Sequence, residues 1–186
     1  MKAISSWLRK ISTTWLMAGT LLLMIAFMIF VLPGQASAAD QASGEAQSPD
    51  LSFFYTPKQL VQMAAEYGSQ GRDAYIRARW TFDLLFPLVY TAFLTVGISW
   101  FINRLDGFSG FWLHTNLVPV LAGIFDLLEN TGTSVSMALY PAQVPGWLFL
   151  ASISTPIKWS YLTGSFILYF GLAAIFLFRK LKNLKD

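Results

Sequence analysis

The chain has 186 residues, of which 55% are hydrophobic and 12% are charged, with a net charge of +3. Soluble domains carry about 25% charged residues, so this composition is typical of a membrane protein, and the small net charge gives no indication of nucleic-acid binding. The absence of cysteine excludes disulfides, thiol catalysis and iron–sulfur ligation, and the single histidine leaves little room for a histidine-rich metal site. We expect neither a metal nor a cofactor.

The first apolar run predicts a membrane helix at about residues 13–32. It follows a short basic start and ends at Pro33-Gly34. At 1.5 Å per residue, residues 15–32 would extend about 27 Å, close to the ~30 Å of a bilayer's hydrocarbon core. The alternative is a signal peptide cleaved after Ala36-Ser37-Ala38, but the run is longer than the apolar region of about 7–15 residues that such peptides carry. We favour a retained helix.

Residues 33–71 are predicted to form an external loop that contains a short amphipathic helix. The stretch 35–49 is small and polar and has no periodicity, so we expect no fold there. An aromatic plug, residues 53–55, leads to Thr56-Pro57, a typical helix start. Apolar residues then recur at helical spacing: Leu60, Val61, Ala64 and Tyr67. Glycines in 68–71 are predicted to end this helix, which would lie flat on the outer surface or across the top of the bundle.

Three further spans are predicted, at about residues 79–103, 111–139 and 157–178. The first of these belongs to one long helix over residues 72–104, and a tight turn at 105–110 follows it. Residues 141–156 are too short to span and are interpreted as an outer connector lying in the interface. The predicted fold class is therefore all-α, a single polytopic membrane domain over residues 1–186 with four transmembrane helices.

Basic residues predict the orientation of these spans. Lys and Arg are more numerous at the ends that include both termini, and such an excess marks the cytoplasmic side. The sequence therefore predicts a bacterial inner-membrane protein with both termini in the cytoplasm and loop 33–71 outside.

The third predicted span carries an unusual group of polar residues. Asp126, Glu129 and Asn130 interrupt an apolar run, and their spacing of three and four places them on one helix face. A charged side chain within a bilayer costs roughly 2.5–3.5 kcal/mol or more, so such residues face the protein interior and usually have partners. Whether the helix runs straight through Gly132 or breaks there decides how deep Glu129 lies.

Polar residues at the outer ends of the neighbouring spans complete a candidate site. Its predicted ligand-binding residues are Asp83, Tyr90, Asp126, Glu129, Asn130, Lys158 and Tyr161, and the predicted ion-pair partners are Arg77 and Arg79. One interpretation is structural, because an ionic network can fix helix register where apolar packing does not. A second is a pocket for a lipid-like or amphipathic ligand. A third is a membrane enzyme that uses Asp126 and Glu129 as acid–base groups, although no signature specifies catalytic residues.

A composite motif carries a family resemblance. It consists of Tyr67-Gly68-x-x-Gly71-Arg72-x-x-Tyr75, then Asp83-x-x-Phe86-Pro87-x-x-Tyr90, then Asp126-x-x-Glu129-Asn130. This motif resembles a pattern in an uncharacterised family of bacterial four-helix integral membrane proteins over roughly residues 57–180, and it implies that fold without implying a function. A looser, architectural likeness links the chain to the sterol-isomerase and sigma-2-receptor group, which also places acids in a membrane pocket.

The function predicted from these features is non-enzymatic. The protein is expected to bind a lipid-like or amphipathic ligand, or to serve as a small accessory subunit of a larger membrane complex. Its expected partners are membrane lipids and either such a complex or further copies of itself. Small residues of the last span offer a contact face for a neighbouring helix: Gly164, Gly171 and Ala174.

Overall fold

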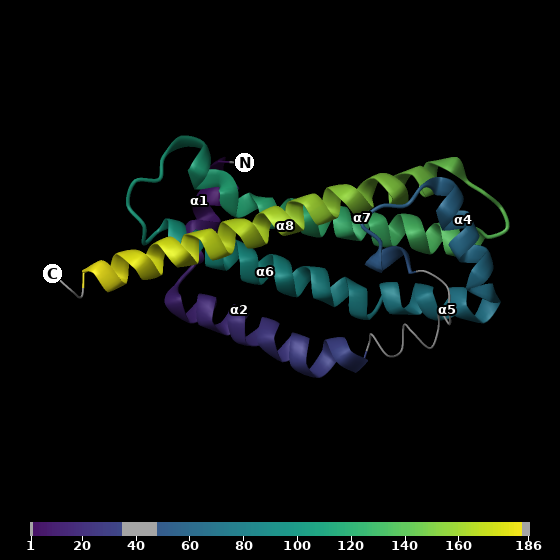
Figure 1. The fold of residues 1–186 in the computed structure, drawn as a ribbon, viewed down its shortest axis with the longest axis horizontal. Coiled ribbons are helices and arrows are strands. Elements are labelled where there is room, and N and C mark those ends of the chain that lie inside the picture. The colour runs from purple at the N-terminus through teal and green to yellow at the C-terminus, as the bar shows by residue number, and fades with distance from the viewer. Residues whose placement is uncertain (1, 35–47, 184–186) are drawn as a thin grey trace. The chain divides into compact units, whose positions relative to one another are not determined.

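All regular elements of the computed structural model, which describes residues 2–34 and 48–183, are helices (Figure 1). Four helical stretches in this part of the chain are long and apolar enough to cross a membrane: Thr14–Gly34, Gly68–Ile102, Gly110–Leu139 and Pro145–Lys182. The predicted all-α class and the four candidate membrane helices are therefore confirmed.

The chain divides into two compact units, and each unit is built from segments far apart in the sequence. Unit 1 comprises residues 1–24, 89–122 and 160–186, and unit 2 comprises residues 25–88 and 123–159. The division falls within the four long helices, which are α2 (Thr14–Ala26), α6 (Phe82–Ile102), α7 (Val118–Leu139) and α8 (Pro145–Lys182). Each of these helices therefore contributes residues to both units.

Unit 1 contains a helix that was interpreted in the sequence only as a basic start. This is α1 (Lys2–Ile11), which contacts the 3-10 helix η3 (Gly110–Leu117). Ser5 Oγ of α1 lies 2.7 Å from Asn116 Oδ1, and the Asn116 amide donates to the backbone oxygen of Ser5 at 3.1 Å and to Ser99 Oγ at 2.9 Å. All three side chains are fully buried. A neutral hydrogen-bond network thus holds α1 in place.

An aromatic core fills the rest of unit 1. The ring of Tyr169 on α8 packs against Phe93 and Phe101 of α6, with centroid separations of 4.7 and 5.5 Å. Gly97 lies directly opposite this ring, and a Cβ atom there would collide with it. The glycine therefore lets α6 and α8 approach closely, as small residues do in packed membrane helices.

Unit 2 begins at Ile25, at the end of α2, and the π-helical stretch η1 (Phe27–Val31) continues that helix. Phe27 stacks on Phe82 and Phe86 of α6 at centroid separations of 5.4 and 5.6 Å. After residues 35–47, which lie outside the described residues, the chain resumes at Ser48 and forms the 3-10 helix η2 (Pro49–Leu51). The possible cleavage site at 36–38 falls entirely on those residues. Most of the stretch 35–49, which was predicted to have no fold, falls on them as well.

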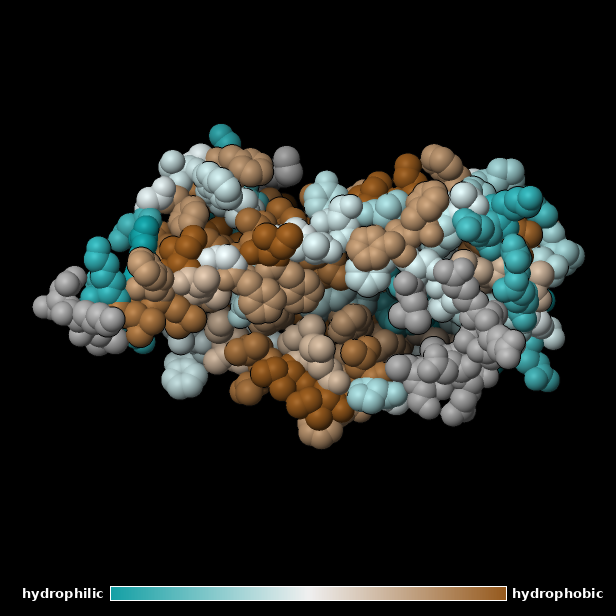
Figure 2. All heavy atoms as spheres, viewed as in Figure 1, coloured by the Kyte–Doolittle hydropathy of each residue, from teal (hydrophilic) through white to brown (hydrophobic). Residues whose placement is uncertain are grey.

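The short amphipathic helix is α4 (Pro57–Glu66), and its predicted start is confirmed. Thr56 Oγ1 accepts a hydrogen bond from the backbone N–H of Gln59 at 3.3 Å, and Gln59 Oε1 accepts one from the backbone N–H of Thr56 at 2.8 Å. Together these bonds form a complete capping box. The apolar face of α4 packs on α7 and α8 through a core that includes Leu60, Met137 and Ala151. Figure 2 shows hydrophilic side chains over the opposite side of α4. The helix thus covers the ends of α7 and α8.

Three predicted boundaries of the helices are wrong. The chain leaves α4 at Gly68, at φ +63°, as predicted, but residues 68–71 already form the first turn of α5 (Gly68–Arg79), so the next helix begins before residue 72. The predicted helix over 72–104 is interrupted at Trp80-Thr81, before α6 begins at Phe82.

The third wrong boundary concerns residues 141–156, which were predicted to be a connector before the last helix. Most of them belong to α8, which begins at Pro145 and continues through Pro156 to Lys182. Proline is favourable in the first turn of a helix, where its missing N–H is not needed. An internal proline such as Pro156 is tolerated where neighbouring helices and hydroxyl side chains satisfy the backbone groups it frees.

Helix α7 (Val118–Leu139) runs without a break through Gly132. A Cβ atom at Gly132 would lie 2.8 Å from the backbone nitrogen of Ala151 on α8. The glycine therefore brings α7 and α8 into backbone contact instead of ending α7, and Glu129 lies well inside the helix.

Candidate functional site

Unit 2 buries an ion pair between α7 and α8. The Nζ atom of Lys158 lies 2.5 Å from Oε2 of Glu129. Glu129 is 0% exposed, and Lys158 is buried as well. Burying two charges costs several kcal/mol per ion, which an ion pair offsets only if other hydrogen bonds satisfy the remaining polar atoms. The surroundings of Glu129 supply such bonds.

The second carboxylate oxygen of Glu129 has two hydroxyl neighbours. Thr155 Oγ1 donates to Oε1 at 2.7 Å, and the hydroxyl of Tyr55 reaches it at 3.5 Å. Thr155 lies three residues before Lys158, on the same side of α8. Tyr55 is 1% exposed and belongs to the segment before α4. Burial raises the pKa of Tyr55 well above its ordinary value, and the negative charge of Glu129 raises that pKa further.

A second ionic group is centred on Arg79, the last residue of α5. Its guanidinium pairs with Asp83 at 2.7 Å and more closely with Asp50 of η2. Tyr75 donates its hydroxyl to Asp50 Oδ1 at 3.1 Å, and the Arg79 guanidinium lies over the Tyr75 ring at 4.7 Å from its centroid. Tyr75, Arg79 and Asp83 follow one another at intervals of four residues, so the end of α5 and the start of α6 present them toward Asp50.

Asn130 and Asp126 connect the two groups. The Asn130 amide on α7 donates to the backbone oxygen of Asp83 on α6 at 3.0 Å. Asp126 lies one turn earlier on α7, is buried, and is close enough for its charge to act on both Lys158 and Asp83. The two ion-pair groups therefore form one region of unit 2. We call it the ionic cluster, and it consists of Asp50, Tyr55, Tyr75, Arg79, Asp83, Asp126, Glu129, Asn130, Thr155 and Lys158.

The structure brings together most of the residues selected from the sequence. Five of the seven candidate ligand-binding residues belong to the ionic cluster, namely Asp83, Asp126, Glu129, Asn130 and Lys158. Tyr90 and Tyr161 belong to unit 1. Of the two arginines, Arg79 is buried in ion pairs, whereas Arg77 is exposed and forms no ion pair with any described residue. Residues two apart on a helix point to different sides, so only one of these arginines can face the cluster.

Sequence reasoning missed four members of the cluster. Asp50 and Tyr55 lie in a segment without periodicity, and no local signal shows where that segment packs. Tyr75 and Thr155 did carry a signal, because they lie four residues before Arg79 and three before Lys158 on helices that were partly predicted. Searching one turn to either side of each predicted charge would have found both.

The charges of the cluster do not balance. It contains four carboxyl groups, those of Asp50, Asp83, Asp126 and Glu129, but only two basic side chains, those of Arg79 and Lys158. Unbalanced charge in an apolar environment is costly, so such a cluster favours either bound protons or a cationic group. Among residues 2–34 and 48–183, no three His, Cys, Asp or Glu side chains are grouped so that they could hold a metal ion.

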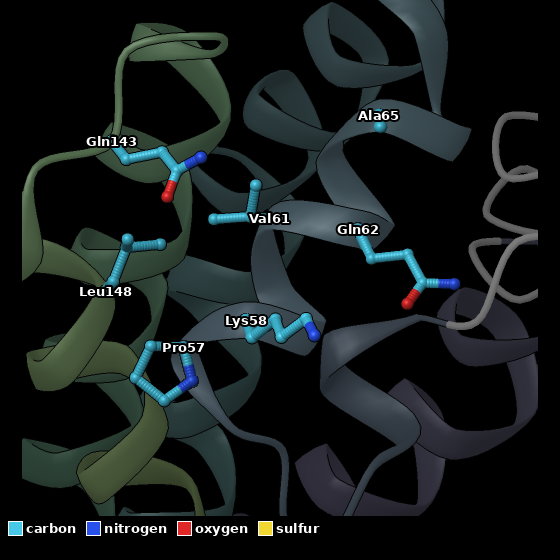
Figure 3. A pocket seen from close by; sticks show the side chains of 7 residues that line it. All are labelled: Pro57, Lys58, Val61, Gln62, Ala65, Gln143 and Leu148. Carbon is cyan, nitrogen blue, oxygen red and sulfur yellow. The ribbon is translucent and has the colours of Figure 1, made fainter.

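A separate pocket of about 500 Å³ opens beside α4. Pro57, Lys58, Val61, Gln62 and Ala65 line it from α4, and Gln143 and Leu148 face them across the opening (Figure 3). It contains no carboxylate and none of the cluster residues. Comparisons with known protein families, with curated proteins and with solved structures found no match for this chain.

Proposed function

We propose that this chain is an integral membrane protein that binds an amphipathic ligand with a cationic head group at the ionic cluster and catalyses no reaction. Four long apolar helices support insertion into a membrane. The distribution of Lys and Arg supports an inner-membrane protein with both termini in the cytoplasm. In this orientation the ionic cluster lies in the outer half of the membrane, beneath the segment that carries α4.

The excess of acid over base in the ionic cluster is the observation that carries the proposal. Four carboxyl groups share two basic side chains, so a cationic ligand would add positive charge where acids outnumber bases. An amphipathic ligand also suits the setting, because its apolar part can remain among the lipid chains while its head group enters the protein.

Unused hydrogen-bonding capacity lies next to the cluster. Ser134 and Ser154 are buried, and neither hydroxyl has a hydrogen-bond partner among the described residues. Ser134 lies one turn after Asn130 on α7, and Ser154 lies one turn before Lys158 on α8, so both extend the faces that carry cluster residues. Buried polar groups in native proteins are rarely unsatisfied, and these hydroxyls are available to a ligand.

The segment before α4 closes the site. Asp50 and Tyr55 reach the cluster from residues 48–56, where η2 is the only helical element. When this segment moves aside, the head group of a ligand enters the site. The head group then takes the place of Tyr55 beside Glu129. The same contacts argue against acid–base catalysis in the closed form, because both Glu129 oxygens are engaged by Lys158, Thr155 and Tyr55.

Native mass spectrometry of the full chain, extracted from its own membranes in a mild detergent, tests this function. We expect a retained small molecule in the natural protein and in Asp73→Asn, which removes an exposed acid of α5. We expect Asp126→Asn to lose that molecule while keeping its helical circular dichroism and its elution as a folded protein. The proposal fails if the natural protein carries no small molecule or if Asp126→Asn retains it equally. A co-purifying protein in place of a small molecule would favour an accessory subunit.

A further inference from the structure

Helix α1 presents three different faces. Its inner face carries the buried Ser5, and the buried Ser12 follows directly after the helix. A second face carries Ile4 and Trp7, each 58% exposed although both are apolar. A third face carries the exposed Lys2, Ser6 and Lys10, which repeat at intervals of four residues. Such a helix has an apolar side and a basic side next to each other, both turned away from the protein.

The orientation of α1 within unit 1 is fixed. Besides the bonds between Ser5 and Asn116, the Arg9 guanidinium donates to Ser5 Oγ at 2.9 Å and to the backbone oxygen of Leu113. The Asn103 amide donates to the backbone oxygen of Arg9 at 2.6 Å. Arg9 is therefore used to hold the helix, which leaves Lys2 and Lys10 as its outward cations. The exposed face cannot be buried by a rotation of α1 unless these bonds break.

The dimensions and neighbours of α1 are those of a helix lying in a membrane interface. Its 10 residues extend about 15 Å, too short to cross a bilayer. Its neighbour η3 exposes two large aromatic side chains, Phe111 at 74% and Trp112 at 54%. Tryptophan is enriched at the level of lipid head groups, where one side of the ring meets apolar chains and the other meets water.

The charge of unit 1 identifies what covers this face. The described residues of unit 1 include seven Lys and Arg residues and one Asp residue, and no acid occurs among the first 39 residues of the chain. No ion pair within the described ranges involves Lys2 or Lys10. A basic residue near an anionic membrane surface strengthens binding by about fivefold. The complementary surface for α1 is therefore a leaflet rich in anionic lipid.

We propose that α1 is an in-plane anchor that binds anionic phospholipid head groups through Lys2 and Lys10, with Ile4 and Trp7 inserted among the acyl chains. This site lies in unit 1 and shares no residue with the ionic cluster. The first 34 residues then act as a surface helix followed by an apolar helix, instead of as a targeting segment whose basic residues only set orientation.

Lipid selectivity gives the first test. The full chain in detergent is titrated with phosphatidylglycerol or phosphatidylcholine, and bound lipid is counted by native mass spectrometry. We expect the natural protein to prefer phosphatidylglycerol and Lys2→Gln/Lys10→Gln to bind it about 25-fold more weakly. The matched control is Lys58→Gln/Arg77→Gln, which removes two exposed bases of unit 2 and should retain the preference. Equal binding of the two lipids, or an unchanged preference in the α1 variant, overturns the proposal.

Depth gives the second test, and the absence of cysteine makes it straightforward. Ile4→Cys and Ser6→Cys each receive one fluorescent label, and the full chain is reconstituted in vesicles of phosphatidylcholine and phosphatidylglycerol. We expect a lipid-borne spin label to quench position 4 several-fold more strongly than position 6, and aqueous iodide to show the reverse order. Equal access of iodide to both positions contradicts an in-plane helix, whatever the outcome of the ligand search at the cluster.

Discussion

Each of the two units contains a polar centre, and the two centres differ in their charge. Unit 1 has a net charge of +6, yet its buried centre is neutral and consists of Ser5, Ser99 and Asn116. The described residues of unit 2 have a net charge of −1, and its centre contains four carboxyl groups and two bases. A neutral network needs only matched donors and acceptors, whereas an ionic one also needs balanced charge. Unit 2 should therefore respond to lost charges, protons and ligands far more than unit 1.

The largest effect is expected when one partner of the Glu129–Lys158 pair is removed. Glu129→Gln leaves a buried ammonium group without its counter-ion and should lower the free energy of unfolding by about 3–5 kcal/mol. Glu129→Gln/Lys158→Met removes both charges and should recover much of that loss, because a buried pair is often replaceable by apolar groups. Equilibrium unfolding in mixed micelles, followed by circular dichroism, measures both. The free-energy loss in the double variant is compared with the summed losses in Glu129→Gln and Lys158→Met measured separately. If the two values are equal, the two residues are not coupled.

The arginines of α5 sharpen the comparison within unit 2 itself. Arg79→Met leaves Asp50 and Asp83 without their base and should cost about 3 kcal/mol. Arg77→Met removes the same charge two residues away from an exposed position and should change stability by less than about 0.5 kcal/mol. Thermal unfolding in detergent compares them directly. Similar losses in the two variants would show that net charge matters and that burial does not.

The neutral centre of unit 1 should be less sensitive. Asn116→Ala leaves Ser5 and Ser99 with unmatched polar atoms and is expected to cost about 1–3 kcal/mol. The cost should appear locally, as faster hydrogen exchange in α1 with unchanged exchange in residues 123–139 of α7, which belong to unit 2. Asn103→Ala, which removes a more exposed bond to the Arg9 backbone, should cost less. A loss in Asn116→Ala as large as that in Glu129→Gln would break the distinction between the two units.

The fold was largely predictable because its signals are local. Apolar runs of membrane-crossing length predicted four candidate spans, and Thr56-Pro57 predicted the start of α4. The missed boundary at Pro145 has a tertiary cause. Pro156 is a helix breaker in isolation, and only packing against other helices shows that α8, which begins at Pro145, continues through it.

The ionic cluster was predictable only where a charge interrupts an apolar run. Asp126 and Glu129 were found in this way, and so was Lys158 at the end of a predicted span. Asp50 and Tyr55 follow a polar stretch, and their importance depends on where residues 48–56 pack. The helix α1 was missed for a related reason, since its basic residues were interpreted only as markers of orientation, while the buried partner of Ser5 lies 111 residues away.

The smallest expected effect is a difference in alkaline stability that originates at Tyr55. Burial and the charge of Glu129 raise the pKa of Tyr55 in the folded chain, so the folded state keeps this proton after the unfolded chain, with a pKa of about 10, has begun to lose it. The contribution is fully present below pH ~10 and is lost as pH rises from there toward the raised pKa. At pH 10.5 the loss is about 0.8 kcal/mol.

Comparison with Tyr55→Phe isolates this contribution, because phenylalanine has no proton to release and the other tyrosines are unchanged. Unfolding free energies measured from pH 8 to 10.5 should fall more steeply in the natural protein than in the variant. Tyr169→Phe, which alters the aromatic core of unit 1, serves as the control and should keep the Tyr55-dependent part of the slope. Parallel pH profiles for the natural protein and Tyr55→Phe would mean that Tyr55 ionises freely in the folded state. Its burial against Glu129, and with it the closed form of the cluster, would then be excluded in solution.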